Sequence, residues 1–108
     1  MAEVEAYDRL EQELRRGVVV LATLSQLQTL RYGYELRQSL AAQGMNIEEG
    51  TLYPLLRRLE SQGLLTSEWR EEEKRNKRFY KLSADGEALL SQLLQEWNTI
   101  NAAITSIL

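Results

Sequence analysis

The chain has 108 residues, of which 44% are hydrophobic and 27% are charged, and it carries a formal net charge of -3. This length suits one ordinary globular domain, and an acidic chain is a poor candidate for indiscriminate coating of nucleic acid, which requires a large positive field. Because the chain has no Cys and no His, disulfides, Cys/His zinc sites, thiol nucleophiles and imidazole bases are excluded. We therefore expect no metal site, no cofactor and no enzymatic activity.

The N-terminal region gives no sign of export or membrane insertion. The first residues are acidic and lack the basic and apolar segments of a signal peptide. The longest purely apolar run, residues 18–22, is far too short to span a bilayer. The sequence therefore predicts a cytoplasmic protein with no membrane attachment.

Charge is unevenly distributed along the chain. Between Arg31 and Ser83 there are ten Lys and Arg residues against eight Asp and Glu residues, a balance of +2. Since the whole chain carries -3, the two flanking segments together carry -5. An anionic partner should therefore meet the middle of the chain.

The first predicted element is a long helix over residues 4–27. Its apolar residues recur at alternating spacings of three and four, which places them on one stripe. The stripe consists of Tyr7, Leu10, Leu14, Gly17, Leu21 and Leu24. Gly17 costs about 1 kcal/mol of helix stability relative to Ala, so we expect another element to approach the helix closely there.

Two shorter helices are predicted next, in the arrangement of a helix-turn-helix. The first runs through residue 42, and the second ends at Gln62 with Gly63 as its stop. Because Pro54 is best tolerated in a first turn, the regular helix is expected to begin around Thr51, whose hydroxyl could cap it, rather than at Glu48.

The second of these helices is strongly amphipathic. Its buried stripe is formed by leucines at i, i+3, i+4 and i+7, namely Leu52, Leu55, Leu56 and Leu59. Thr51, Tyr53, Arg57 and Arg58 lie outside the stripe and can hydrogen-bond or carry positive charge. Such a face suits the major groove of DNA, with the early positions nearest to the base edges. The alternative is a solvent-exposed helix with two ordinary arginines.

A hairpin is predicted after this helix. Residues 64–70 and 77–82 carry strand-favouring side chains, and the wholly polar segment 71–76 between them forms a solvated tip. The returning limb places Arg75, Lys77 and Arg78 as a candidate phosphate clamp, although strand alternation sends Lys77 and Arg78 to opposite sides. The alternative is a solubilising hairpin whose opposite charges neutralise each other. Tyr32 and Tyr34 lie where a helix N-terminus could bind phosphate, but they could equally serve packing.

The last predicted helix begins after Ser83, a good N-cap, and runs to the chain end. Its apolar residues follow a strict heptad pattern, which is typical of a helix that packs against other helices. We expect an interface between two copies of the chain that contains Tyr7, Leu10, Leu90, Leu93, Trp97, Ile100, Ile104 and Ile107. The alternative is that the first and last helices pack only within one chain. If Trp97 meets its symmetry mate, the two indoles could hold a flat aromatic effector.

These elements predict a mainly α (α+β) winged helix-turn-helix with a two-stranded wing and a C-terminal dimerisation helix. Residues 1–82 form the DNA-binding core and residues 83–108 the dimerisation helix, within one compact domain.

Five short motifs resemble the PadR family of bacterial transcriptional regulators, over nearly the whole chain. They are YGYEL at 32–36, GTLYPLL at 50–56, RLE with GLL at 58–65, RFY at 78–80 and SADG at 83–86. The length and the single helix after the hairpin are similar to the small members of that family.

The resemblance implies a homodimeric repressor whose third helix enters the major groove, whose wing touches the backbone, and which small aromatic compounds can release from DNA. It further implies that Thr51 and Tyr53 contact DNA and that Trp97 lines the dimer centre. Where the family commonly has serine before this helix, the chain has Glu48 and Glu49, which bring negative charge close to DNA.

Our hypothesis from the sequence is a sequence-specific DNA-binding transcriptional repressor that recognises an inverted repeat in double-stranded DNA. The alternative is a winged-helix module that binds another protein and has no specific affinity for DNA.

Overall fold

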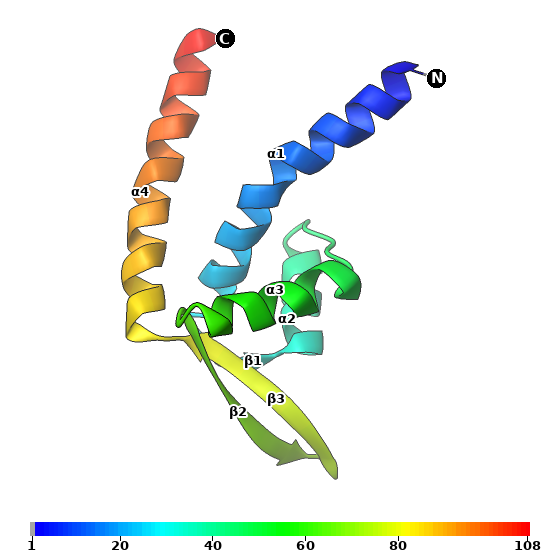
Figure 1. Ribbon diagram of the computed structural model, residues 1–108, viewed down its shortest axis with the longest axis vertical. Helices are drawn as coiled ribbons and strands as arrows, with labels where there is room; N and C mark the ends of the chain where they lie inside the picture. The colour runs from blue at the N-terminus through cyan, green and yellow to red at the C-terminus, as the bar shows by residue number, and fades with distance from the viewer. Residues whose placement is uncertain (1) are drawn as a thin grey trace.

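Four helices and one antiparallel sheet make up residues 2–108, which the computed structural model describes (Figure 1). The helices are α1 (Ala2–Gln26), α2 (Gly33–Ala42), α3 (Glu49–Ser61) and α4 (Ala84–Ile107). The strands are β1 (Arg31–Tyr32), β2 (Leu65–Glu72) and β3 (Arg75–Leu82), in the sheet order β1-β3-β2. The winged helix-turn-helix prediction is therefore confirmed, and β1 adds a short third strand to the predicted two-stranded wing.

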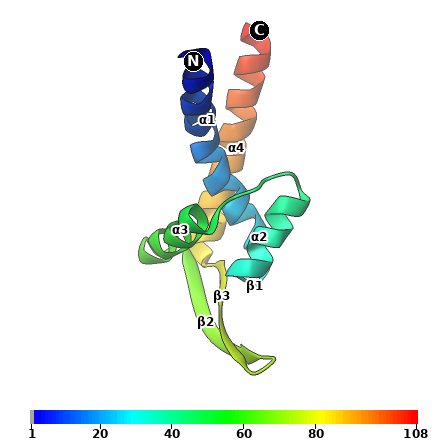
Figure 2. The same cartoon turned by 90° about the vertical axis from the view of Figure 1, so that its right-hand side faces the viewer.

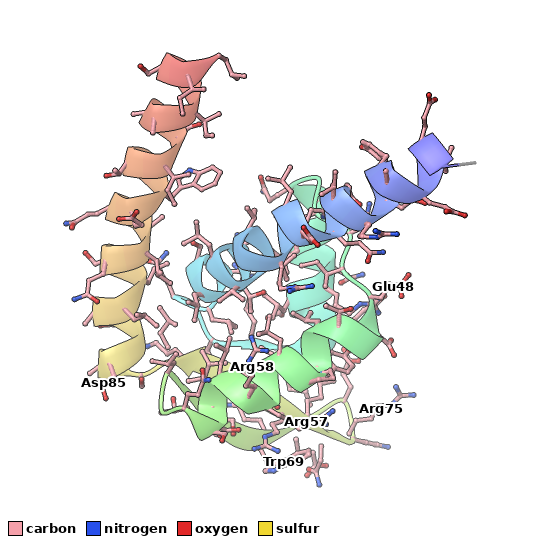
Figure 3. The ribbon with its side chains drawn as sticks, turned by 45° about the horizontal axis from the view of Figure 1, so that its top comes forward. Glu48, Arg57, Arg58, Trp69, Arg75 and Asp85 are labelled. Carbon is pink, nitrogen blue, oxygen red and sulfur yellow. The ribbon has the colours of Figure 1, made fainter. Side chains whose placement is uncertain are left out.

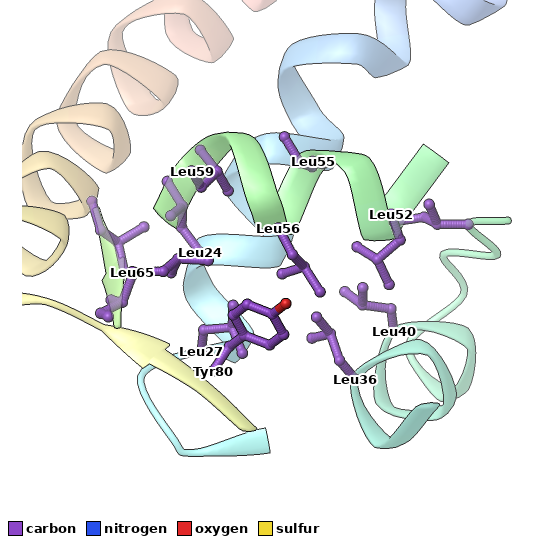
Figure 4. Packing of buried hydrophobic residues seen from close by; sticks show 13 residues of the cluster. Leu24, Leu27, Leu36, Leu40, Leu52, Leu55, Leu56, Leu59, Leu65 and Tyr80 are labelled. Atoms are coloured by element: carbon purple, nitrogen blue, oxygen red, sulfur yellow. The ribbon is translucent and has the colours of Figure 1, made fainter. Parts of the chain in front are cut away.

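The core lies where the C-terminal end of α1, the inner faces of α2 and α3, and the base of the sheet meet (Figure 4). The predicted leucine stripe of α3 is confirmed, because its four members are at most 7% exposed. They pack against Leu24 and Leu27 of α1 and Leu36 and Leu40 of α2, while Tyr80 closes the cluster from the wing. Burial of these side chains holds α3 in a fixed position relative to the other elements.

The start of α3 differs from the sequence prediction. The helix begins at Glu49, with Glu48 as an N-cap that accepts backbone hydrogen bonds from Thr51 and Leu52 but makes none through its own side chain. Pro54 lies inside the helix and removes only one intrahelical donor. The prediction that the helix begins at Thr51 was therefore wrong, because the buried leucines hold the first turn in place despite the proline.

The wing is longer and more regular than predicted. Paired residues run from Leu65 opposite Leu82 to Glu72 opposite Arg75, so most of the expected solvated tip is strand. The turn contains only Glu73 and Lys74, with φ of 51° and 66°. Two positive φ values are typical of the tight turn whose twist matches that of the paired strands.

The first turn of α4 is docked tightly against the chain that precedes β2. Ser83 is the N-cap, as predicted, and its hydroxyl accepts a hydrogen bond from the Gly86 N–H at 3.0 Å. A Cβ at position 86 would lie 2.0 Å from the carbonyl oxygen of Leu64, so only glycine permits this approach. Leu90 is 4% exposed and belongs to the core, and Leu93 packs against it. We therefore correct the assignment of Leu90 to a subunit interface, because its own chain buries it.

The helices α1 and α4 diverge as they leave the core, and both chain ends lie at the end of the molecule opposite the wing (Figures 1 and 2). The outer parts of both helices expose large apolar side chains. Apart from its chain neighbours and the backbone of its own helix, nothing among residues 2–108 lies within 4 Å of a Cβ built on Gly17, so these residues make no close approach of the kind predicted there. None of the helices within residues 2–108 combines the length and apolar character needed to cross a membrane.

Candidate nucleic-acid interface

A groove of about 340 Å³ lies between α3 and the wing. It brings together side chains from the start of α2, from α3 and from both long strands. We call it the wing groove, and its lining includes Tyr32, Tyr34, Tyr53, Arg57, Trp69, Lys77 and Arg78. All of these residues except Trp69 were predicted DNA contacts. The fold brings residues up to 46 positions apart in sequence together on one surface of aromatic and cationic side chains.

The two neighbouring arginines of α3 lie on different surfaces. Arg57 lines the wing groove, on the same side of α3 as Trp69 and Arg75, whereas Arg58 lies on the side facing α1 (Figure 3). Arg58 and Thr51 line a second groove of about 720 Å³ between α1 and α3. Adjacent residues on a helix point about 100° apart, which explains the separation. Arg57 and Arg58 therefore do not form one continuous cationic face.

The tyrosines of the groove have partly structural roles. Tyr53 is half-buried and lies against Gly33, where an added Cβ would come within 2.6 Å of its ring carbon Cε1. The ring of Tyr32 packs edge-on against Phe79 at 5.3 Å between centroids. Tyr34, by contrast, is 53% exposed, and its hydroxyl accepts a hydrogen bond from Gln38. Tyr34 is therefore the most available of the three for a partner.

The cations of the wing are engaged to different extents. The Lys77 ammonium lies 4.4 Å from the centre of the Tyr32 ring, so this cation is held against an aromatic ring that also lines the groove. Arg78 donates to Glu60 at 2.7 Å and lies over the rings of Trp69 and Tyr80. Arg75, next to the turn, is exposed. Within residues 2–108, Arg57, Arg75 and Lys77 form no ion pair with an acidic side chain.

Glu48 and Glu49, at the start of α3, differ in whether a nearby cation compensates their negative charge. Glu49 forms an ion pair with Arg37 at 2.9 Å, and the same guanidinium donates to the carbonyl of Ile47. Glu48 is exposed and forms no ion pair among the described residues. The negative charge of Glu49 is therefore compensated, and that of Glu48 is not.

Trp69 also lines this surface, although the sequence pattern was not interpreted as placing it there. It is 66% exposed on β2, directly opposite Arg78 of β3. A signal was available, because strand alternation from the buried Leu65 places Trp69 on the same side of the sheet. Because Trp69 lies on that side but outside the core, it is placed beside α3.

Tyr80 is a buried ionisable group that lines this surface. Burial raises the pKa of Tyr80 above its ordinary value, although the nearby Arg78 opposes the shift. The phenol therefore stays neutral at physiological pH and acts as a packing residue. The chemistry of the groove is instead that of cations and aromatic faces, which suits phosphate and sugar groups.

Comparisons with known proteins agree in sequence and in structure. The profile of the family described as "Transcriptional regulator PadR-like family" matches residues 20–92. The crystal structure of a PadR family transcriptional regulator from Eggerthella lenta DSM 2243 is 40% identical, with a TM-score of 0.89 over 99% of this chain and 96% of that one. A transcriptional regulator from Clostridium thermocellum is 28% identical, with a TM-score of 0.80 over 87% of this chain and 96% of that one.

A curated relative matches over a shorter segment. The transcriptional regulator Rv3488 from Mycobacterium tuberculosis is 43% identical over 61 residues, which are 56% of this chain. The match spans 57% of the length of that relative.

Proposed function

Because the chain belongs to the PadR-like family of transcriptional regulators, and so regulates transcription by binding DNA, we propose that it is a homodimeric repressor of an inverted-repeat operator. One observation carries the proposal. The helix α3 and the wing meet in a groove lined by cations and aromatic side chains, at the end of the molecule away from both chain ends. Such a regulator needs access to DNA, so we also propose that it acts in the cytoplasm.

In the proposed complex, the first turns of α3 enter the major groove and the wing follows the adjacent backbone. Thr51 and Tyr53 lie nearest to the bases, while Arg57, Lys77 and Arg75 neutralise phosphates. Support comes from the wing groove, which Tyr53, Arg57 and Lys77 line, and from the absence of acidic partners for the three cations within residues 2–108. Thr51 lines the groove between α1 and α3, so its proposed base contact rests on its place in the first turn of α3.

The proposed dimer uses the diverging ends of α1 and α4. Their large apolar side chains are 41% to 68% exposed at Tyr7, Leu10, Trp97, Ile100 and Ile104, which is an unusually large apolar surface for an isolated small domain. A second copy of α4 has the matching heptad spacing and would cover both helices. Ile107 is 77% exposed and extends the same stripe.

A two-fold dimer explains why an inverted repeat is the expected operator. Two copies of α3 related by a two-fold axis read two half-sites of opposite orientation. The centres of these half-sites should lie about 10 bp apart, or a multiple of that spacing. Binding at a promoter would then block transcription, which is the repressor role that we propose.

An aromatic effector is a further part of the proposal. Trp97 is 41% exposed on the dimerising face, so two copies would face each other across the axis. A flat aromatic compound between the indoles would alter the separation of the two α3 helices. Effector and DNA should then weaken each other's binding by the same factor.

The test begins with selection of bound fragments from a random duplex pool by the purified protein, followed by sedimentation. We expect a dimer and an enriched sequence with two-fold symmetry. Arg57→Ala should weaken operator binding about tenfold, whereas Arg58→Ala, on the other groove, should have a smaller effect. Equal effects of the two variants would contradict the assignment of the wing groove.

Ile104→Glu tests dimerisation without changing any residue of the proposed DNA-binding surface. It places a charge within the apolar stripe of α4, far from α3, so it should produce monomers and reduce operator binding. A monomeric wild-type protein, or one that binds no duplex better than about 10⁻⁴ to 10⁻⁶ M, would instead favour a protein-binding module.

A further inference from the structure

A polar cluster joins the C-terminal end of α3 to the base of the wing. The Ser67 hydroxyl donates to one oxygen of the Glu60 carboxylate, and Arg78 donates to the other oxygen at 2.7 Å. The cluster closes through a third hydrogen bond, because Nε of Arg78 donates to the Ser67 hydroxyl at 3.1 Å. We call these three residues the Glu60–Ser67–Arg78 cluster.

The cluster is partly screened from solvent and backed by aromatic rings. The side chains of Arg78 and Glu60 are 37% and 26% exposed. The guanidinium lies 5.7 Å from the centre of the Trp69 ring and 5.5 Å from that of Tyr80. Two of the five N–H donors of Arg78 are therefore engaged, and its guanidinium is held in one orientation, before any DNA arrives.

The position of the cluster determines what it can control. Glu60 lies one residue before the end of α3, while Ser67 and Arg78 belong to different strands of the wing. Beyond the cluster, the hairpin extends away from the hydrophobic core to its turn at Glu73 and Lys74 (Figure 1). A two-stranded hairpin alone is at best marginally stable, so the angle of the wing to α3 depends on contacts at its base, which are this cluster and the pairing of β1 with β3.

We propose that the Glu60–Ser67–Arg78 cluster is a positioning device that fixes the wing relative to the DNA-binding helix, and that Arg78 is a positioning residue and not a phosphate contact. The inference rests on the proposed DNA-binding function and adds to it. The cluster holds Lys77 and Arg75 at the separation from α3 that one DNA backbone requires. The cluster thus acts on DNA affinity through the wing, without touching DNA.

The direction in which Glu60→Gln changes operator affinity distinguishes a positioning role from simple electrostatic repulsion. Glu60→Gln removes a negative charge close to bound DNA, so through-space repulsion alone predicts tighter binding. Loss of the ion pair predicts weaker binding, because the wing is no longer held. We expect operator affinity to fall about three- to tenfold at about 0.1 M salt, the range expected when a partly exposed charge-assisted contact is lost.

Glu71, on the same strand as Ser67, provides a matched control for the loss of negative charge in Glu60→Gln. Glu71 lies on β2 four residues after Ser67, on the same side of the sheet, and forms no ion pair within the described part of the chain. Glu71→Gln removes the same charge without disturbing the cluster. Its operator affinity should rise by up to about threefold.

The salt dependence of binding gives a second measurement. A wing that is released from α3 loses phosphate contacts, so the slope of log affinity against log salt should decrease by about 1 in Glu60→Gln. The slope of Glu71→Gln should stay at the wild-type value. Arg78→Lys keeps the charge but cannot bond both Glu60 and Ser67 in this planar geometry, so it should behave like Glu60→Gln.

A measurement without DNA isolates the structural step. Amide hydrogen exchange of β2 and β3 beyond Ser67 should become faster in Glu60→Gln, while exchange in the C-terminal half of α1 stays unchanged. Thermal unfolding of each variant establishes that the domain remains folded. Unchanged exchange in the wing would overturn the proposal.

The outcomes also separate this inference from the function on which it rests. If wild-type protein binds its operator and Glu60→Gln binds equally well or more tightly, the positioning role is overturned and the DNA-binding function stands. If wild-type protein shows no specific duplex binding, both are overturned together.

Discussion

Glu48 is an unfavourable residue at the start of the DNA-binding helix, and replacing it should improve both folding and DNA binding. It occupies the N-cap of α3 with φ -73° and ψ 151°, and its side chain caps nothing. The same chain contains the favourable arrangement at Ser83, whose φ of -76° and ψ of 173° are similar and whose hydroxyl accepts from the N–H three residues later. Glu48→Ser should therefore place a hydroxyl within reach of the Thr51 N–H, which now donates only to the Glu48 backbone carbonyl and would share its proton between the two oxygens.

The expected size of the effect follows from two opposing contributions. An N-cap hydroxyl contributes about 1 kcal/mol, and loss of a negative charge at the helix N-terminus costs about 0.3–1 kcal/mol. The net gain in free energy of unfolding is about 0.5 kcal/mol, which corresponds to roughly 2 °C in the melting temperature of a domain this size. For DNA, one unit charge roughly 7 Å from a phosphate is worth about 0.6 kcal/mol in water, so operator affinity should rise about threefold.

Glu48→Gln is the control that separates the cap from the charge. It removes the charge but supplies no good capping group, so it should gain DNA affinity without gaining stability. Thermal unfolding should be followed at one fixed protein concentration, since dimerisation would make the midpoint concentration-dependent. The reasoning is refuted if both variants bind the operator more weakly. That result would indicate that the Glu48 carboxylate accepts a hydrogen bond from a cytosine amino group.

Three further variants test the fold. Gly86→Ala should lower the free energy of unfolding by about 1–3 kcal/mol, because the new methyl group meets the Leu64 carbonyl oxygen; wild-type stability in urea would contradict this close approach. Glu73→Asn with Lys74→Gly should raise stability by about 0.5–1 kcal/mol, since both positions have positive φ, and an unchanged urea midpoint would argue against this turn. Burial raises the pKa of Tyr80 above its ordinary 10.0, so the folded chain keeps a proton that the unfolded chain loses. Stability should therefore fall as pH rises above 10.0, and the fall should be smaller in Tyr80→Phe; an equal fall in both proteins would exclude this cause.

Features with a local pattern were predictable from the sequence. The leucine stripe of α3 follows from helical periodicity, and its members are buried as expected. The cap at Ser83 follows from residue type and from the acidic first turn after it. In both cases, the information lies within about ten consecutive residues.

Features that depend on packing between distant segments were not predictable in the same way. The strand β1 has two residues, too few for any periodicity, and exists because it pairs with β3. The burial of Leu90 follows from the docking of α4 on the loop before β2, whereas its heptad position looked identical to that of Trp97. Heptad spacing identifies one face of a helix but does not show where along the helix the chain itself stops covering that face.

Packing between distant segments also decides which cations are held in ion pairs and which remain available. This division affects how the regulator binds its operator. Arg37 compensates Glu49, Arg70 pairs with Glu68 and Arg78 pairs with Glu60, so the number of Lys and Arg residues in the sequence overstates the number of cations available to DNA. The whole chain is also acidic, with a net charge of -3. Steering toward arbitrary duplex DNA should therefore be weak, and the affinity for the operator must come from the correct placement of a few cations. On this argument, fixing the wing matters more than adding charge to it, because a misplaced lysine contributes little to either affinity or specificity.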